Sequence, residues 1–167
     1  NTINIHGALL PQYRGANPTQ WALLNNETET GVTMHYMTGE FDAGEIIAAR
    51  KIPVLFEDTW RDIAERQDAA TMEILAQEMP KVLAGTNPRR PQDESMARHY
   101  RRRHPEDGLI EWEQSVLGIY NLVRALVKPH PGAFYWQDGR KVVLDEYLHI
   151  PQVTRLKYNS PGGAQAL

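Results

Sequence analysis

Apolar and polar positions alternate along three segments near the start of the chain, and this period of two is typical of half-buried strands. The segments cover residues 2–6, 30–37 and 45–54. Between the first two, Asn17 is followed by Pro18, which predicts a helix start, because asparagine caps helices and proline fits the first helical position. Strands that alternate with helices in this way predict a mixed α/β fold.

A longer helical pattern follows the third predicted strand. Thr59, with Asp62 three residues later, resembles a capping box and predicts where this helix begins. One face is predicted to be buried and contains Ile63, Gln67, Ala70, Ile74 and Val82. Pro80 should kink or split the helix, because proline lacks the amide hydrogen, and Gly85 should end it.

The pattern changes again after residue 85. Residues 86–108 contain Gly, Pro, Arg and Asp without periodicity, which predicts a linker. A helix is predicted over 114–127, with Val116 on its apolar stripe, and Asp138-Gly139 between two apolar runs predicts a β-hairpin. The predicted division of the chain is a first domain over 1–86, a linker over 87–112 and a C-terminal subdomain over 113–167.

Composition restricts the classes of protein that remain. The chain has 167 residues, of which 41% are hydrophobic and 23% charged, a balance typical of a globular protein. No apolar run approaches the roughly 18 residues that span a membrane, so we expect no membrane association. The absence of cysteine excludes disulfides and cysteine nucleophiles and fits a cytoplasmic location, which we predict. The net charge of -3 argues against a general nucleic-acid surface.

Three polar residues could form a reactive site. Asn4 and His6 lie two positions apart on a predicted strand, so their side chains share one face near the strand's end. An amide can donate to a developing oxyanion, and an imidazole can exchange a proton near neutral pH. Asp42, in a glycine-flanked loop, could orient His6 and raise its pKa. These residues suit acyl transfer; alternatively, the pair is incidental and Asp42 is a turn residue.

The wider sequence resembles the folate-dependent formyltransferases. The stretch NIHGALLPQYRGANP over 4–18 is similar to the family signature, and it is followed by ETGVT at 29–33 and FDAGEI at 41–46. The resemblance covers roughly residues 2–145 and implies an α/β fold, the C-terminal part of a Rossmann-like formyltransferase domain followed by a small helix and β-hairpin subdomain. Because Asn1 leads directly into a strand, we expect the N-terminal part of the catalytic domain to be missing.

This resemblance implies a reaction and a set of residues. The family transfers a formyl group from 10-formyltetrahydrofolate to an amine, with no metal. Asn4 and His6 would contact the formyl oxygen, with His6 as proton donor, and Asp42 would orient His6 and assist proton removal from the amine. The predicted folate-binding residues are Thr38, Gly39, Glu40, Phe41 and Asp42.

The segment YRRRHPEDGLIEW over 100–112 resembles the linker of the sugar formyltransferases, which implies a nucleotide-linked amino sugar as the acceptor. Guanidinium groups match phosphate oxygens, and the predicted substrate-binding residues are Arg14, Arg101, Arg102 and Arg103. These arginines could instead contact tRNA phosphates or form a solvated charge run. Trp112 and His35 are interpreted as core and structural residues.

Two other functions stay open from the sequence. One is methionyl-tRNA formyltransferase, although the acidic net charge argues against a nucleic-acid partner. The other is an inactive fragment or binding module, which is supported by Ala8 at a position where the family usually has serine. The family resemblance also implies a homodimer formed through the C-terminal subdomain.

Overall fold

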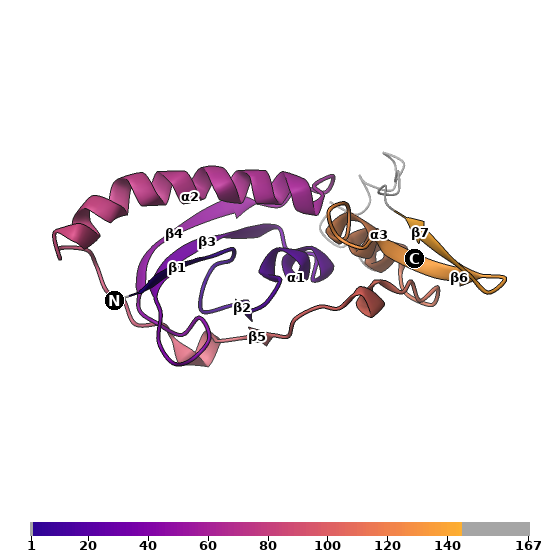
Figure 1. The fold of residues 1–167 in the computed structure, drawn as a ribbon, viewed down its shortest axis with the longest axis horizontal. Helices are drawn as coiled ribbons and strands as arrows, with labels where there is room; N and C mark the ends of the chain where they lie inside the picture. The colour runs from indigo at the N-terminus through magenta and orange to yellow at the C-terminus, as the bar shows by residue number, and fades with distance from the viewer. Residues whose placement is uncertain (1, 145–167) are drawn as a thin grey trace, which may run out of the picture.

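The computed structural model describes residues 2–144, and Figure 1 shows them as an elongated molecule with α2 along one side. The helices are α1 (Pro18–Leu24), α2 (Trp60–Leu83) and α3 (Val116–Ala125), with short 3-10 turns η1 (Glu94–Met96) and η2 (Pro105–Gly108). The strands are β1 (Ile3–His6), β2 (Arg14–Gly15), β3 (Glu29–Tyr36), β4 (Ile46–Pro53), β5 (His99–Tyr100), β6 (Ala133–Gln137) and β7 (Arg140–Leu144). This arrangement confirms the predicted α/β class.

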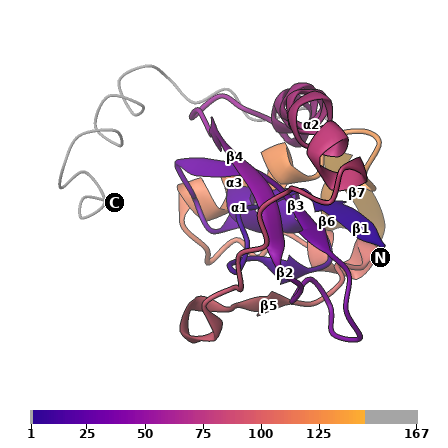
Figure 2. The ribbon, with the colours of Figure 1, turned by 90° about the vertical axis from the view of Figure 1, so that its left-hand side faces the viewer.

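A three-stranded sheet in the order β1-β3-β4 forms the centre of the N-terminal part. Its strands are antiparallel, and the register pairs Asn4 with His35 and His6 with Thr33. The views in Figures 1 and 2 agree that α2 lies on one side of the sheet and the β2–β5 pair on the other. Residues of the core include Leu23, Val32, Met34, Ile47, Ile63 and Ile74.

Helix α2 begins as predicted, because the Asp62 carboxylate accepts the backbone N–H of Thr59 at 2.8 Å. Ile63 and Ile74 are buried on its sheet-facing side, which confirms the predicted face. The predicted split at Pro80 is wrong, since the helix continues to Leu83. Pro80 lies in the last turn, where its missing amide hydrogen costs the helix a single bond near an end that frays in any case.

Helix α1 begins at Pro18 directly after Asn17, as predicted, but the Asn17 side chain does not cap it. The Asn17 backbone is left-handed, with φ of 57°, and its Oδ1 accepts the backbone N–H of Arg103 at 3.0 Å. Two predicted burials are wrong. Val116 is 54% exposed, because it begins α3 and the buried stripe starts one turn later. Trp112 is 60% exposed, with its ring edge against Tyr135, and so does not lie in the core.

The C-terminal part contains the predicted hairpin. Strands β6 and β7 pair around Asp138 and Gly139, whose φ values of 49° and 74° suit a tight hairpin turn. Residues 145–167 of the predicted subdomain lie outside the described residues. Across 2–144, no helix is both long and apolar enough to cross a bilayer.

The predicted linker runs along the N-terminal part, and β5 pairs in parallel with β2, so Arg14 lies opposite His99 and Gly15 opposite Tyr100. Segments about 85 positions apart in sequence therefore lie side by side. The proposed boundaries at 87 and 112 stay predictions, but the intervening chain contributes contacts to the first domain.

Candidate active site

The structure brings together the three residues predicted to be catalytic. Strand β1 carries Asn4 and His6, and Asp42 reaches them from the loop between β3 and β4. The Asn4 amide donates to Asp42 Oδ1 over 3.4 Å, and His6 Nδ1 lies 3.5 Å from Asp42 Oδ2. Both contacts are long for hydrogen bonds, so a ligand can compete for the same polar atoms.

Local backbone geometry directs Asp42 toward β1. Its own φ of 52° is left-handed, which aspartate tolerates better than most residues. The backbone N–H of Gly15 donates to Asp42 Oδ2 at 2.8 Å. Position 15 requires glycine, because its φ is 100° and a Cβ there would lie 2.3 Å from the Tyr100 carbonyl oxygen.

His6 is buried, and its proton is placed by a backbone acceptor. Its Nε2 lies 2.7 Å from the Tyr13 carbonyl oxygen, which can only accept, so Nε2 carries the hydrogen. Burial lowers the pKa of His6, and this outweighs the charge of Asp42 and the Tyr13 carbonyl, which both raise it. Asp42 therefore acts on the pKa of His6 in the predicted direction, while the depth of burial decides the sign of the net shift.

Asp42 is ionised at neutral pH. Burial opposes its charged form, but the hydrogen bonds with His35 and the Gly15 N–H, together with the charge of His6, outweigh burial and lower its pKa to about 2. A carboxylate with so low a pKa is a weak base. The Asp42 carboxylate is therefore better suited to stabilising a neighbouring positive charge than to binding a proton.

His35 belongs to the same cluster, although the sequence indicated only a structural residue. Its Nε2 lies 3.3 Å from Asn4 Nδ2 and 3.5 Å from Asp42 Oδ1, and its Nδ1 lies 2.9 Å from the Tyr36 carbonyl oxygen. The Tyr36 carbonyl accepts the hydrogen of Nδ1, which holds the ring with its Nε2 toward Asn4 and Asp42. Only the strand register, which pairs Asn4 with His35, could have indicated this contact.

The loop predicted to bind folate encloses a cavity next to the cluster. The cavity has a volume of about 130 Å³, and its lining includes all five predicted residues together with Asn4 and His35. Phe41 is 83% exposed at its edge, so an apolar ring lies open beside the polar cluster. A planar ligand with polar edges would match this combination of surfaces.

The four arginines predicted to bind substrate lie in different environments. Arg14 is 1% exposed, and its guanidinium donates to Glu94 at 2.9 and 2.7 Å. Arg101 pairs with Asp107 at 2.6 Å, and Arg103 lies over the ring of Trp21 at 5.1 Å. Arg102 is exposed. None of the contacts described for Arg101, Arg102 or Arg103 joins them to the catalytic cluster, so their substrate role stays a prediction.

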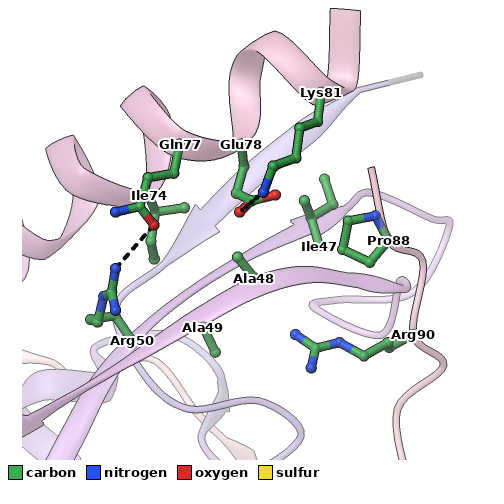
Figure 3. A pocket seen from close by; sticks show the side chains of 10 residues that line it. All are labelled: Ile47, Ala48, Ala49, Arg50, Ile74, Gln77, Glu78, Lys81, Pro88 and Arg90. Atoms are coloured by element: carbon green, nitrogen blue, oxygen red, sulfur yellow. Dashed lines mark hydrogen bonds and ion pairs between the residues drawn. The ribbon is translucent and has the colours of Figure 1, made fainter. Parts of the chain in front are cut away.

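A second hollow of about 310 Å³ lies between β4, α2 and the chain near Arg90 (Figure 3). Its polar walls are largely paired with each other: Arg50 donates to Gln77 at 3.2 Å, and Lys81 donates to Glu78 at 2.7 Å. Asn4, His6 and Asp42 do not line it. We therefore assign it no part in the chemistry.

Within the described part of the chain, no group of three or more His, Asp or Glu side chains is arranged to hold a metal ion.

Two family profiles match the sequence. One, described as formyl transferase, matches residues 1–79, and the other, described as formyl transferase, C-terminal domain, matches residues 103–162. Together they cover well over half of the chain.

Solved structures share the fold. An N-formyltransferase from Helicobacter canadensis, in complex with folinic acid and dTDP-3-aminofucose, is 23% identical with a TM-score of 0.73, over 84% of this chain and 52% of that one. A 4-N formyltransferase from Francisella tularensis is 22% identical with a TM-score of 0.78, over 89% and 63%. A variant of HypX from Aquifex aeolicus is 24% identical with a TM-score of 0.73, over 85% and 25%. This chain thus spans about half the length of the Helicobacter protein.

Proposed function

Because this chain belongs to the formyl transferase family, we propose that its protein transfers a formyl group from 10-formyltetrahydrofolate to the amine of a nucleotide-linked amino sugar. The observation that carries the proposal is the convergence of Asn4, His6 and Asp42 beside the cavity of the 38–42 loop. An amide donor, an imidazole and an ionised carboxylate are the groups that acyl transfer to an amine needs.

Each residue has a defined part in the proposed reaction. The acceptor nitrogen attacks the formyl carbon, and negative charge develops on the formyl oxygen. The Asn4 amide donates a hydrogen bond to that oxygen, and His6 donates from Nδ1 in its imidazolium form, because its Nε2–H is held by the Tyr13 carbonyl. Asp42, with its pKa of about 2, stabilises the positive charge on the attacking nitrogen and holds the His6 ring. When the intermediate collapses, the bond from carbon to the folate nitrogen breaks, and the proton lost by the amine ends on that nitrogen.

The sugar acceptor rests on two supports. The Helicobacter neighbour was crystallised with dTDP-3-aminofucose, and this chain has a cluster of arginines near α1. Arg101 and Arg102 are both exposed, and because Arg101 is paired with Asp107, we propose that Arg102 contacts the diphosphate of the nucleotide. The cytoplasmic location and the homodimer stay predictions.

Formyl transfer by the natural full-length protein tests the proposal. The protein would be incubated with 10-formyltetrahydrofolate and, separately, with dTDP-linked amino sugars and methionyl-tRNA, and products would be identified by mass spectrometry. We expect a formylated sugar nucleotide. Formylation of methionyl-tRNA alone would favour the tRNA enzyme, and folate binding without turnover on any acceptor would favour a binding module.

Replacing Arg102 and Arg103 together by alanine should raise the KM for the sugar nucleotide about tenfold or more, because charge-assisted bonds to the diphosphate are lost. The KM for the folate should change little. Steady-state kinetics with each substrate varied in turn measures both constants. Arg140→Ala, on the exposed hairpin, is the matched control, and equal weakening of both substrates would contradict the assignment.

A further inference from the structure

The 38–42 loop has little packing of its own to fix Asp42. Residues 37–41 are exposed, and Phe41 is 83% exposed. A loop with so few buried contacts has low local stability. The direction of the Asp42 carboxylate must therefore be set from outside the loop.

Gln92, in the predicted linker, supplies contacts of this kind. Its Nε2 donates to the backbone carbonyls of Asp42 and Gly44, each at 2.7 Å. Its Oε1 accepts from Arg14 Nε at 3.1 Å and from Arg14 Nη2 at 2.8 Å. Both ends of the amide are saturated, and only this orientation matches donors with acceptors.

Arg14 in turn is rigidly held. Its guanidinium is buried and makes a two-pronged pair with Glu94, which raises the pKa of Arg14 further. Glu94 is presented by the turn η1, in which Asp93 Oδ1 accepts the backbone N–H of Ser95 at 3.0 Å. A fixed arginine therefore fixes the Gln92 amide.

Two adjacent residues of β2, Arg14 and Gly15, together fix both the backbone and the side chain of Asp42. Gly15, next to Arg14 in β2, holds the Asp42 carboxylate through its N–H. The Arg14 side chain holds Gln92, which holds the Asp42 backbone. The carboxylate and the main chain of one residue are thus fixed relative to each other.

We infer that Gln92 is a positioning residue, which aims the Asp42 carboxylate at His6 by clamping the backbone of residues 42–44, with Arg14 and Glu94 holding its amide. The inference rests on the proposed function only for its effect on turnover. It also gives Arg14 a role within the protein, while the predicted contact of Arg14 with the acceptor stays a prediction.

The geometry leaves little tolerance at this point. His6 Nδ1 and Asp42 Oδ2 are 3.5 Å apart, so a further shift of about 1 Å would end their interaction, and displacements of that size can cost about a hundredfold in rate. The titratable groups that face His6 are Asp42 from the loop and His35 from β3. Moving Asp42 away weakens the effect of its charge, which raises the pKa of His6.

Gln92→Met tests the inference, because methionine has a similar length and cannot hydrogen-bond to the two carbonyls. In the natural full-length protein we expect kcat to fall roughly 10- to 100-fold, with a small change in the KM for the folate. Gln77→Met, which removes a glutamine on α2 that binds Arg50, is the matched control and should leave kcat unchanged. Thermal unfolding would establish that both variants are folded at the assay temperature.

A second readout does not depend on formyl transfer. The titration of the His6 ring, followed by NMR and assigned with His6→Asn, should move to lower pH in Gln92→Met and stay in place in Gln77→Met. Wild-type turnover in Gln92→Met, or lost turnover with an unmoved His6 titration, would overturn the inference. If the wild-type protein formylates nothing, the proposed function fails, while the titration still decides the role of Gln92.

Discussion

Replacement of His6 by asparagine is expected to lower turnover about tenfold or more while the protein stays folded. The ordinary pKa of an imidazole lies near neutrality, and the proposed reaction needs His6 to supply a hydrogen to the formyl oxygen. Asparagine keeps a polar side chain but cannot exchange a proton near pH 7. Formyl-transfer rates at saturating substrate measure the effect.

The control for this variant must separate chemistry from folding. His6 is buried and bonded to the Tyr13 carbonyl, so some loss of stability is expected, on the order of 1–3 kcal/mol for an unpaired buried group. His104→Asn changes an exposed histidine in the same way and should leave turnover intact. A folded His6→Asn protein with normal turnover would end the assignment of His6.

The sequence predicted the parts of the site that depend on local geometry or on motif. Residues two apart on a strand must share a face, so Asn4 and His6 could be paired before the fold was known. The Thr59–Asp62 cap and the Asp138-Gly139 turn are local as well, and both are present.

The features of the site that the sequence did not predict depend on contacts between segments far apart in the chain. Gln92 meets Arg14 across 78 positions and the Asp42 carbonyl across 50, from a stretch without periodicity that offered no pattern to read. His35 enters the site only through the register of β1 on β3. The net pKa shift of His6 has the same origin, because burial is a property of the assembled fold and its size decides between opposing effects.

Asp42→Asn is expected to reduce turnover by a similar factor of about ten or more and to displace the pH profile. The amide keeps the shape of the carboxylate but removes the charge that holds the attacking amine and the His6 ring. It also presents a mixture of donor and acceptor to the Gly15 N–H, where the carboxylate offers acceptors alone.

The direction of the pH shift follows from the two pKa changes. Asp42 has its pKa lowered to about 2, so it stays ionised through the working range and does not itself shape the profile near neutrality. Its charge raises the pKa of His6 against the effect of burial, so its removal lets the pKa of His6 fall further. The limb of the pH–rate profile that reports His6 should therefore move to lower pH.

Formyl-transfer rates measured across the pH range in Asp42→Asn and in Asp138→Asn would test this predicted shift. The second variant makes the same change in the exposed hairpin turn, where asparagine also tolerates the left-handed backbone, and should match the wild-type profile. A slow Asp42→Asn enzyme with an unshifted profile would mean that Asp42 acts on the amine alone. The His6–Asp42 contact would then carry no electrostatic coupling, and the inference that Gln92 aims Asp42 at His6 would be wrong.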